Sequence, residues 1–205
     1  HAPFQIIVVD GASSESCKNI CQQYQAIRLT SEPCRGKQLL AGAAIAEGDV
    51  LWFLHADAHL PQDSMTTITA AITKGAVGGY FKFRFNEPRG WAAKMLEPAI
   101  ALRCRLGVPY GDQGLFVSKD AYFKAQGHAP WPLFEEVPLV KNIRRLGNFI
   151  ALGTPILVDS RRWQHDGWWH RTWENRKLAL AFIFGCPPVV LAKKYRSHLT
   201  NFKQD

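Results

Sequence analysis

The chain has 205 residues, of which 47% are hydrophobic and 20% charged, so it is long enough and apolar enough to bury one substantial core. It carries no low-complexity tract and no internal repeat, which excludes a solenoid. The net charge of +8 lies wholly in the last third, because residues 1–139 hold 13 basic and 13 acidic side chains while residues 140–205 hold 12 and 4.

The basic last third leaves two interpretations open. It indicates either a localised anionic partner, such as phosphate or lipid head groups, or a solvated basic tail. The apolar run at 178–192 has 15 residues, which is too short to cross a bilayer. Because basic residues flank this run, segment 176–196 is expected either to contact a membrane surface or to form a buried helix pair.

The cysteines indicate the compartment. There are five, an odd number, and no two of them form a C-x-x-C pair. This usage favours reduced thiols over a disulfide framework. Since no signal peptide is visible either, we expect a cytoplasmic protein, with peripheral contact at the inner membrane face as the further expectation.

The first 75 residues alternate between apolar runs and amphipathic or alanine-rich segments. Runs rich in β-branched or aromatic residues predict strands, and segments that begin near Ser, Arg or Pro predict helices. The expected elements are strands at 4–10, 26–29 and 50–54 and helices at 13–25, 35–48 and 61–75. This alternation predicts a parallel sheet covered by helices.

The pattern then changes. In residues 79–85, Phe81, Phe83 and Phe85 alternate with polar side chains, which is typical of a half-exposed, antiparallel strand with Tyr80 on its outer side. The following expected elements are helices at 91–107 and 135–147, strands at 114–118 and 155–160, and a tail that is helical on either side of Pro187 and Pro188. We expect one α/β domain.

The end of the third strand carries residues suited to a metal ion. His55, Asp57 and His59 follow the apolar run directly. If residues 55–59 stay extended, the three side chains point the same way, because side-chain direction alternates along a strand. A carboxylate flanked by imidazoles suits a divalent cation. The simpler alternative is that Asp57 caps the next helix and the histidines lie on the surface.

Two further segments carry functional residue types. Glu135 and Glu136 are adjacent carboxylates at the start of an expected helix, where acids also complement the helix dipole. Arg161, Arg162 and Trp163 follow the last expected strand. Arginine beside an aromatic ring suits a diphosphate next to a sugar or base, although a surface cation–π pair explains it equally well.

Four motifs in this order resemble the family 2 glycosyltransferases of the GT-A type. They are "RGKQ", "LHAD", "GDQGLF" and "RRWQ", and the resemblance runs from about Phe4 to Trp169. It implies a GT-A three-layer sandwich with a mixed, mainly parallel central sheet and a helical C-terminal tail. The implied division is a nucleotide-binding half (1–76), an acceptor and catalytic half (77–165) and a basic helical tail (166–205).

The resemblance also implies roles for single residues. The nucleotide-binding positions are Asp10, Arg35 and Lys37. The metal motif D-x-D is matched by His55 and Asp57, to which His59 adds a further metal-ligand candidate. The implied cofactor is a divalent cation, Mn²⁺ or Mg²⁺.

The catalytic and acceptor positions lie in the second half of the chain. The implied catalytic pair is Glu135 and Glu136, with Glu136 as the base. The family's Q-x-x-R-W motif aligns with residues that would contact the diphosphate and the acceptor, Arg162 and Trp163. The remaining candidates for the acceptor and sugar pocket are Gly111, Asp112 and Gln113.

The implied reaction is transfer of a sugar from a nucleoside diphosphate, uridine-based by family habit, to an acceptor hydroxyl with inversion. A cation at Asp57, aided by Arg162, would neutralise the leaving diphosphate. A carboxylate at Glu136 would accept the proton of the attacking hydroxyl. Nucleotide-sugar donor and acceptor are thus the expected partners, and no nucleic acid is expected.

The chain departs from the family pattern at three points. His55 replaces the first aspartate of the metal motif, and Glu136 replaces the usual aspartate base. The strand at 4–10 starts almost at the N-terminus, so we expect the family's first strand and helix to be missing. That strand normally sits centrally and its loop touches the base, which implies either a truncated product or weak donor binding.

Two other functions stay open at this stage. The H-x-D-x-H cluster also suits a metal-dependent hydrolase, although the other histidines have no metal-ligand pair spacing. The second alternative is a basic module without catalysis that binds an anionic membrane or nucleic acid through residues 140–205, although no RNA-binding motif is present.

Overall fold

The first two strands form a small sheet of their own. The computed structural model describes residues 4–56, 58–86 and 90–200, with only the backbone for Arg162 and residues 196–200. Strand β1 (Ile7–Asp10) pairs in parallel with β2 (Ile27–Thr30). The helix between them, α1 (Glu15–Gln23), begins after Ser14, whose hydroxyl accepts a hydrogen bond from the backbone of Cys17.

A second sheet of four strands holds most of the core. Its order is β3 (Val50–Trp52), β5 (Phe116–Ser118), β4 (Ala76–Phe85), β6 (Asn148–Val158). Strand β5 is antiparallel to both of its neighbours, whereas β4 and β6 are parallel. The expected antiparallel pairing of β4 is therefore right for one of its two edges.

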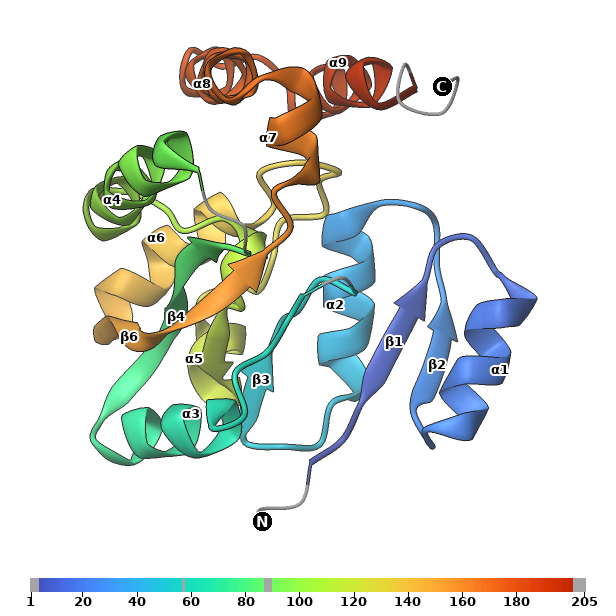
Figure 1. The fold of residues 1–205 in the computed structure, drawn as a ribbon. Coiled ribbons are helices and arrows are strands. Elements are labelled where there is room, and N and C mark those ends of the chain that lie inside the picture. Colours follow the sequence, from blue (N-terminus) through green and yellow to red (C-terminus); the bar gives the residue numbers. More distant parts are fainter. Residues whose placement is uncertain (1–3, 57, 87–89, 201–205) are drawn as a thin grey trace.

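Within the described part of the chain, no strand pairing joins the two sheets. Strand β3 pairs with β5 and not with β1, so the described strands do not form the single, mainly parallel sheet that the alternation predicted. That detail was wrong, because local periodicity identifies a strand but not its partner. Figure 1 shows β1 and β2 with α1 at one side of the molecule and β3 to β6 at the other.

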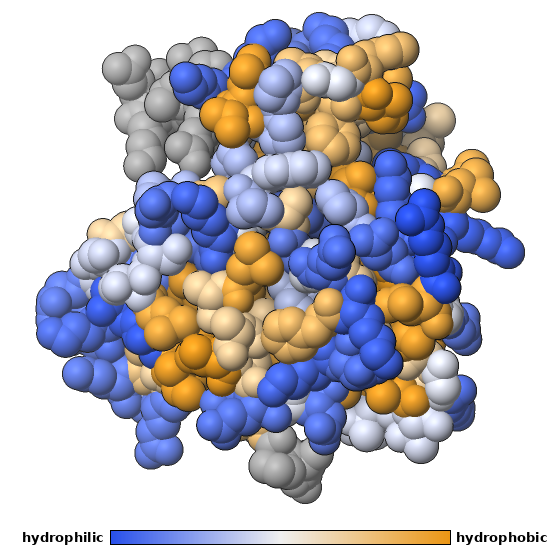
Figure 2. All heavy atoms as spheres, turned by 180° about the vertical axis from the view of Figure 1, so that it is seen from behind, coloured by the Kyte–Doolittle hydropathy of each residue, from blue (hydrophilic) through white to orange (hydrophobic). Residues whose placement is uncertain are grey.

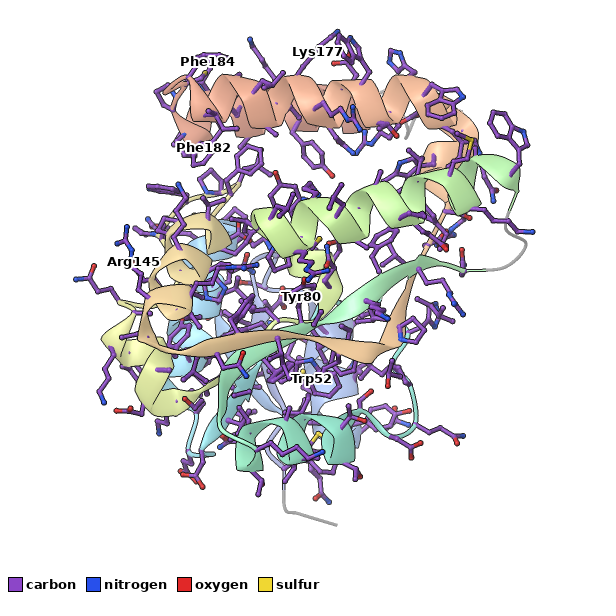
Figure 3. All side chains as sticks on the ribbon, turned by 90° about the vertical axis from the view of Figure 1, so that its left-hand side faces the viewer. Trp52, Tyr80, Arg145, Lys177, Phe182 and Phe184 are labelled. Atoms are coloured by element: carbon purple, nitrogen blue, oxygen red, sulfur yellow. The ribbon has the colours of Figure 1, made fainter. Side chains whose placement is uncertain are left out.

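Helices cover both faces of the four-stranded sheet. Helix α3 (Ser64–Thr73) packs on the face that carries Phe116, and α6 (Glu136–Leu146) packs on the face that carries Val117. This follows from the alternation of side chains along β5. In Figure 3, Trp52 lies on the side of α3, and Tyr80 lies on the opposite side, beneath α4 (Trp91–Leu106).

Strand β4 shows both the success and the limit of its pattern. Phe81 and Phe85 are fully buried, and Lys82 and Arg84 are exposed, as the alternation predicted. Tyr80 was expected on the outer side but is only 5% exposed, because α4 covers it.

The remaining helices lie around the second sheet and above it. They are α2 (Arg35–Ile45), the 3₁₀ turn η1 (Gly111–Gln113), α5 (Lys119–Lys124), α7 (Arg161–Asp166), α8 (Trp168–Ile183) and α9 (Pro188–Thr200). The tail is helical on either side of the two prolines, as predicted. Figure 1 shows α8 and α9 as a layer across the top of the molecule. Within the part of the chain that the structure describes, no helix is long and apolar enough to span a membrane.

Candidate active site

An ion pair links the "RGKQ" motif to the acidic pair. Arg35 is the first residue of α2, and its Nε forms an ion pair with Oε1 of Glu135 at 2.5 Å. Glu135 is only 2% exposed and directly precedes α6. A terminal guanidinium nitrogen of Arg35 also contacts Nε2 of His55. The structure thus brings together three of the predicted site residues, from three separate motifs.

Glu136 is buried beside this pair. It is 5% exposed, and its Oε2 has no hydrogen-bond partner among the described residues. Burial, followed by the negative charge of Glu135, raises the pKa of Glu136 to about 8. The carboxyl group is therefore mostly protonated at neutral pH and becomes a base when it ionises, which is a property of many catalytic carboxylates.

The segment after β3 turns and does not remain extended. The backbone N–H of Ala58 donates to the carbonyl of His55 at 3.1 Å. His59 is exposed and forms an isolated antiparallel bridge to Leu157 of β6. The expected extended conformation of residues 55–59 was wrong, because this hydrogen bond draws the chain back on itself. Asp57 lies outside the described residues.

The described residues do not by themselves fit a metal ion. Among residues 4–56, 58–86 and 90–200 no three His, Cys, Asp or Glu side chains form a group that could hold one. His55 is engaged with Arg35, and neither His55 nor His59 belongs to such a group. The predicted ligand set therefore depends on Asp57, which the structure does not describe.

The other nucleotide-binding candidates are held by local contacts. The Asp10 carboxylate accepts hydrogen bonds from the backbone of Ala12 and Ser14, both at 2.8 Å, and from Arg28 at 2.9 Å. The hydrogen bond from Arg28, together with that from Ala12, lowers the pKa of Asp10 to about 2. Lys37 pairs with Glu32 at 2.6 Å on the surface. The structure does not group Asp10 or Lys37 with the carboxylate pair.

Gly36 of the same motif has a packing role. Its backbone N–H donates to the carbonyl of Trp131 at 2.9 Å. A Cβ at this position would overlap the carbonyl oxygen of Ala129. Only glycine lets segment 129–131 approach the first turn of α2 this closely, and this approach places α2 against the chain that leads into Glu135.

The "GDQGLF" segment divides between the surface and the core. Asp112 lines a large pocket, and Gly111 lines a small cavity. Gln113 is 1% exposed and donates to Sγ of Cys104 at 3.1 Å, so it faces the core. Gly114 has φ +58, a left-handed conformation that favours glycine, and it ends the 3₁₀ turn before β5.

The "RRWQ" residues lie in helix α7 and not at an extended strand end. Asp159 accepts hydrogen bonds from the backbone and the Nε of Arg161, at 2.8 and 2.5 Å. Trp163 packs against Phe85 with ring centroids 5.0 Å apart. The Arg162 side chain lies outside the described part.

Two cavities adjoin these residues. A pocket of about 690 Å³ lies between β4, β6, α4 and α8, and its lining includes Arg35, His55, Asp112 and Trp163. A cavity of about 10 Å³ is lined by Glu135, Glu136, Gly111 and Arg35. Arg35 thus borders both, and Glu136 lines only the small one.

The wall of the large pocket contains residues that the sequence reasoning missed. They are contributed by α4 and α8 and include Leu96, Ile100, Arg103, Arg171 and Leu178. The dense run of Trp and Arg in residues 168–177 was the available signal. It was interpreted only as part of a basic tail.

The family profile described as "Glycosyl transferase family 2" matches residues 1–129. The chain belongs to glycosyl transferase family 2. No curated protein matches it significantly.

Solved structures of other glycosyltransferases share the fold. A mannosyltransferase from Pyrobaculum calidifontis, in complex with GDP-Man and Mn²⁺, has a TM-score of 0.61 and 12% identity over 85% of this chain and 51% of that chain. Glucosyl-3-phosphoglycerate synthase from Mycobacterium tuberculosis has a TM-score of 0.51 and 20% identity over 73% of this chain and 59% of that chain. GalNAc-T7 with UDP, GalNAc and Mn²⁺ has a TM-score of 0.55 and 12% identity over 76% of this chain and 37% of that chain.

These likenesses confirm the predicted fold class of this family 2 member, an α/β GT-A fold with mixed sheets and C-terminal helices. At these identities they establish the fold alone. The chain spans between about two fifths and three fifths of the length of the three structures.

Proposed function

We propose that the protein transfers a sugar from a nucleoside-diphosphate donor, UDP-based, to an acceptor hydroxyl with inversion at the anomeric carbon. The observation that carries this is the buried carboxylate pair at the start of α6, in contact with Arg35 of α2. Membership of glycosyl transferase family 2 supports a sugar transfer over the hydrolase alternative.

In this proposal Glu136 is the base. The acceptor hydroxyl gives its proton to Glu136, and its oxygen bonds to the anomeric carbon as the bond from that carbon to the diphosphate breaks. The nucleoside diphosphate leaves with the bonding electrons. The raised pKa of Glu136, about 8, suits proton abstraction at neutral to mildly basic pH.

Arg35 is the proposed contact of the donor diphosphate. It is a cation at the N-terminus of α2, where the helix dipole also favours negative charge, and it lines the large pocket. Because Arg35 borders both cavities, a diphosphate that draws it from Glu135 would open a way from the pocket to Glu136. Arg162 and Trp163 keep their proposed role at the diphosphate and acceptor.

A divalent cation, Mn²⁺ or Mg²⁺, remains part of the proposal. Structures with the same fold were solved with Mn²⁺. The described residues of this chain make no site for it, so the proposed ligand is Asp57. Such an ion would supply positive charge to the diphosphate.

The test is calorimetric titration of UDP, GDP and ADP, each with and without Mn²⁺. We expect UDP to bind more tightly than the others, and Mn²⁺ to strengthen the binding. Asp57→Asn should remove the increase in UDP affinity that Mn²⁺ causes. Arg35→Gln should weaken the binding of UDP. If none of the three nucleotides binds at millimolar concentration, the proposal is wrong.

The proposed membrane contact involves the end of α8 and the start of α9. Ile183 and Phe184 are 73% and 86% exposed, and Val189 is 56% exposed. Figure 3 shows Phe184 at the end of α8, whereas Phe182 points toward the body of the protein. Figure 2 shows hydrophobic and hydrophilic residues interleaved over the layer that α8 and α9 form. Exposed apolar side chains among cations suit an anionic membrane surface.

Vesicle sedimentation tests this contact. The protein should bind vesicles that contain anionic phospholipid and should bind neutral vesicles more weakly. A double variant, Ile183→Ser with Phe184→Ser, should lose most of the binding, whereas Arg145→Gln on the distant α6 should change it little. Equal binding by the double variant and the native chain contradicts the contact.

A further inference from the structure

The large pocket carries a buried cation that the reaction scheme does not use. Arg171 of α8 is 6% exposed and lines the pocket. One of its terminal nitrogens lies 3.4 Å from Asp166, and the other donates to the hydroxyl of Tyr195 at 3.2 Å. Its Nε has no hydrogen-bond partner within the described part of the chain.

This environment leaves the positive charge of Arg171 incompletely balanced. The ion pair with Asp166, the one that Arg171 makes with a described residue, is longer than the 2.7–2.9 Å that is usual for a charge-assisted hydrogen bond. A buried charge is costly unless it is paired and hydrogen-bonded. A buried guanidinium with a donor to spare, at the wall of a pocket, is therefore suited to an anion bound there.

The pocket lining has an excess of positive charge, which remains when Glu135 and Asp166, outside the lining, are counted against Arg35 and Arg171. Its lining includes Arg35, Arg103, Arg161, Arg171 and Arg176. The acidic residues in the same lining are Asp112 and Asp159. An excess of guanidinium groups favours a phosphate, which carries close to two negative charges at neutral pH, over a carboxylate with one.

Most of the rest of the wall is apolar, although it also includes Thr172 and Asn175. It is built from opposite sides by β4, α4 and α8, with Phe83, Leu96, Ile100 and Leu178 among the lining residues. Figure 3 shows α8, which carries Lys177 and Phe182, running above α4. A polar sugar would gain little from such a wall, whereas an alkyl or isoprenoid chain would be removed from water along it.

We propose that the acceptor is an amphipathic phosphate ester with a free hydroxyl, whose phosphate is held by Arg171 and whose apolar chain lies between α4 and α8. This rests on the proposed sugar transfer and names the class of its acceptor. The phosphate is the binding group; the hydroxyl is the nucleophile, which loses its proton to Glu136.

Calorimetry with octyl phosphate, inorganic phosphate and 1-octanol tests the proposal without a nucleotide. Octyl phosphate should bind at least ten times more tightly than either of the other two, since only it has both the charge and the chain. Binding of octyl phosphate no tighter than 1-octanol, or no tighter than inorganic phosphate, overturns the proposal.

Variants test separately whether Arg171 binds the phosphate and whether the apolar wall binds the chain. Arg171→Gln should lower the affinity for octyl phosphate at least tenfold, and Arg171→Lys should restore part of that affinity. Ala99→Trp, which fills the pocket from α4, should lower the affinity for octyl phosphate and leave the affinity for inorganic phosphate unchanged. Arg145→Gln, an exposed arginine outside the pocket, is the matched control. Octyl phosphate binding that survives both Arg171→Gln and Ala99→Trp contradicts the site.

Circular dichroism of each variant separates lost binding from lost folding. If Arg171→Gln does not fold, the octyl phosphate affinities of Arg171→Lys and Ala99→Trp decide whether the site is correct. UDP titration separates this proposal from the reaction itself. If UDP binds and octyl phosphate does not, the acceptor class is wrong and the sugar transfer stands. If octyl phosphate binds and no nucleoside diphosphate does, the reaction is wrong.

Discussion

The Nε of Arg35 forms an ion pair with Oε1 of Glu135 at 2.5 Å, which ties the first residue of α2 to the residue that precedes α6. The Glu135 side chain is 3% exposed and that of Arg35 is 36% exposed. The pair joins a motif from the N-terminal half of the chain to the carboxylates of the second half, so stability and site geometry depend on the same contact.

Replacement of Arg35 should destabilise the protein through Glu135. Arg35→Gln leaves a buried carboxylate without its cation, which we expect to cost about 1–3 kcal/mol of unfolding free energy. The partial exposure of Arg35 keeps the cost at the lower end. Urea denaturation at pH 7 measures it.

A double-mutant cycle tests whether that cost comes from the pair. Glu135→Gln combined with Arg35→Gln should recover part of the stability that Arg35→Gln alone loses, because no buried charge is then left unpaired. Strictly additive losses contradict this explanation.

The glycine of the "RGKQ" motif should be intolerant of any side chain. Gly36→Ala places a Cβ against the backbone carbonyl of Ala129, and we expect it to cost about 1–3 kcal/mol, as overpacking usually does. Gly153→Ala is the matched control, because a Cβ there meets nothing within 4 Å. Thermal unfolding of both variants should show a clear loss for the first and little change for the second.

The raised pKa of Glu136 has a consequence for stability. Since it lies above the ordinary 4.5, the folded state holds a proton that the unfolded state releases, and stability should fall as the pH rises from about 4.5 to about 8. Glu136→Gln removes this dependence. The melting temperature of the variant minus that of the native chain should therefore increase with pH over this window. Above the window this difference should stay constant.

The exposed Glu15→Gln is the control for this series. It should follow the native chain at pH 4.5 to 8, because Glu15 is paired with Lys18 on the surface and its pKa is lowered, not raised. A Glu136→Gln variant whose advantage does not grow with pH would mean that Glu136 is ionised at neutral pH.

Much of the fold could be predicted because its signals are local. The strands at β1, β2 and β3 and the helices α2, α3 and α4 were found from periodicity and from their first and last residues. The first half of β6 was missed, because the predicted strand began only at Pro155. Gly153 and Thr154 lie at a register shift against β4, where the strand continues.

The candidate site was predicted less completely, since contacts between distant segments decide it. The pairing of Glu135 with Arg35 has no local signal, nor does the turn that follows His55. Arg171 was counted only as part of a basic tail. Its burial depends on Asp166 and Tyr195, which no spacing rule connects to it.

The most direct test of the account is the rate at which UDP-sugars release UDP by transfer of the sugar to water, whose proton Glu136 accepts. It is measured for the native chain and for Glu136→Gln from pH 6 to pH 9. We expect the native rate to rise with pH and level off above about 8, as Glu136 ionises. Glu136→Gln should lower it by about 10²–10⁴-fold while still binding UDP, and Glu136→Asp should retain part of it. Equal rates for the native chain and a folded, UDP-binding Glu136→Gln would show that this carboxylate is not the base.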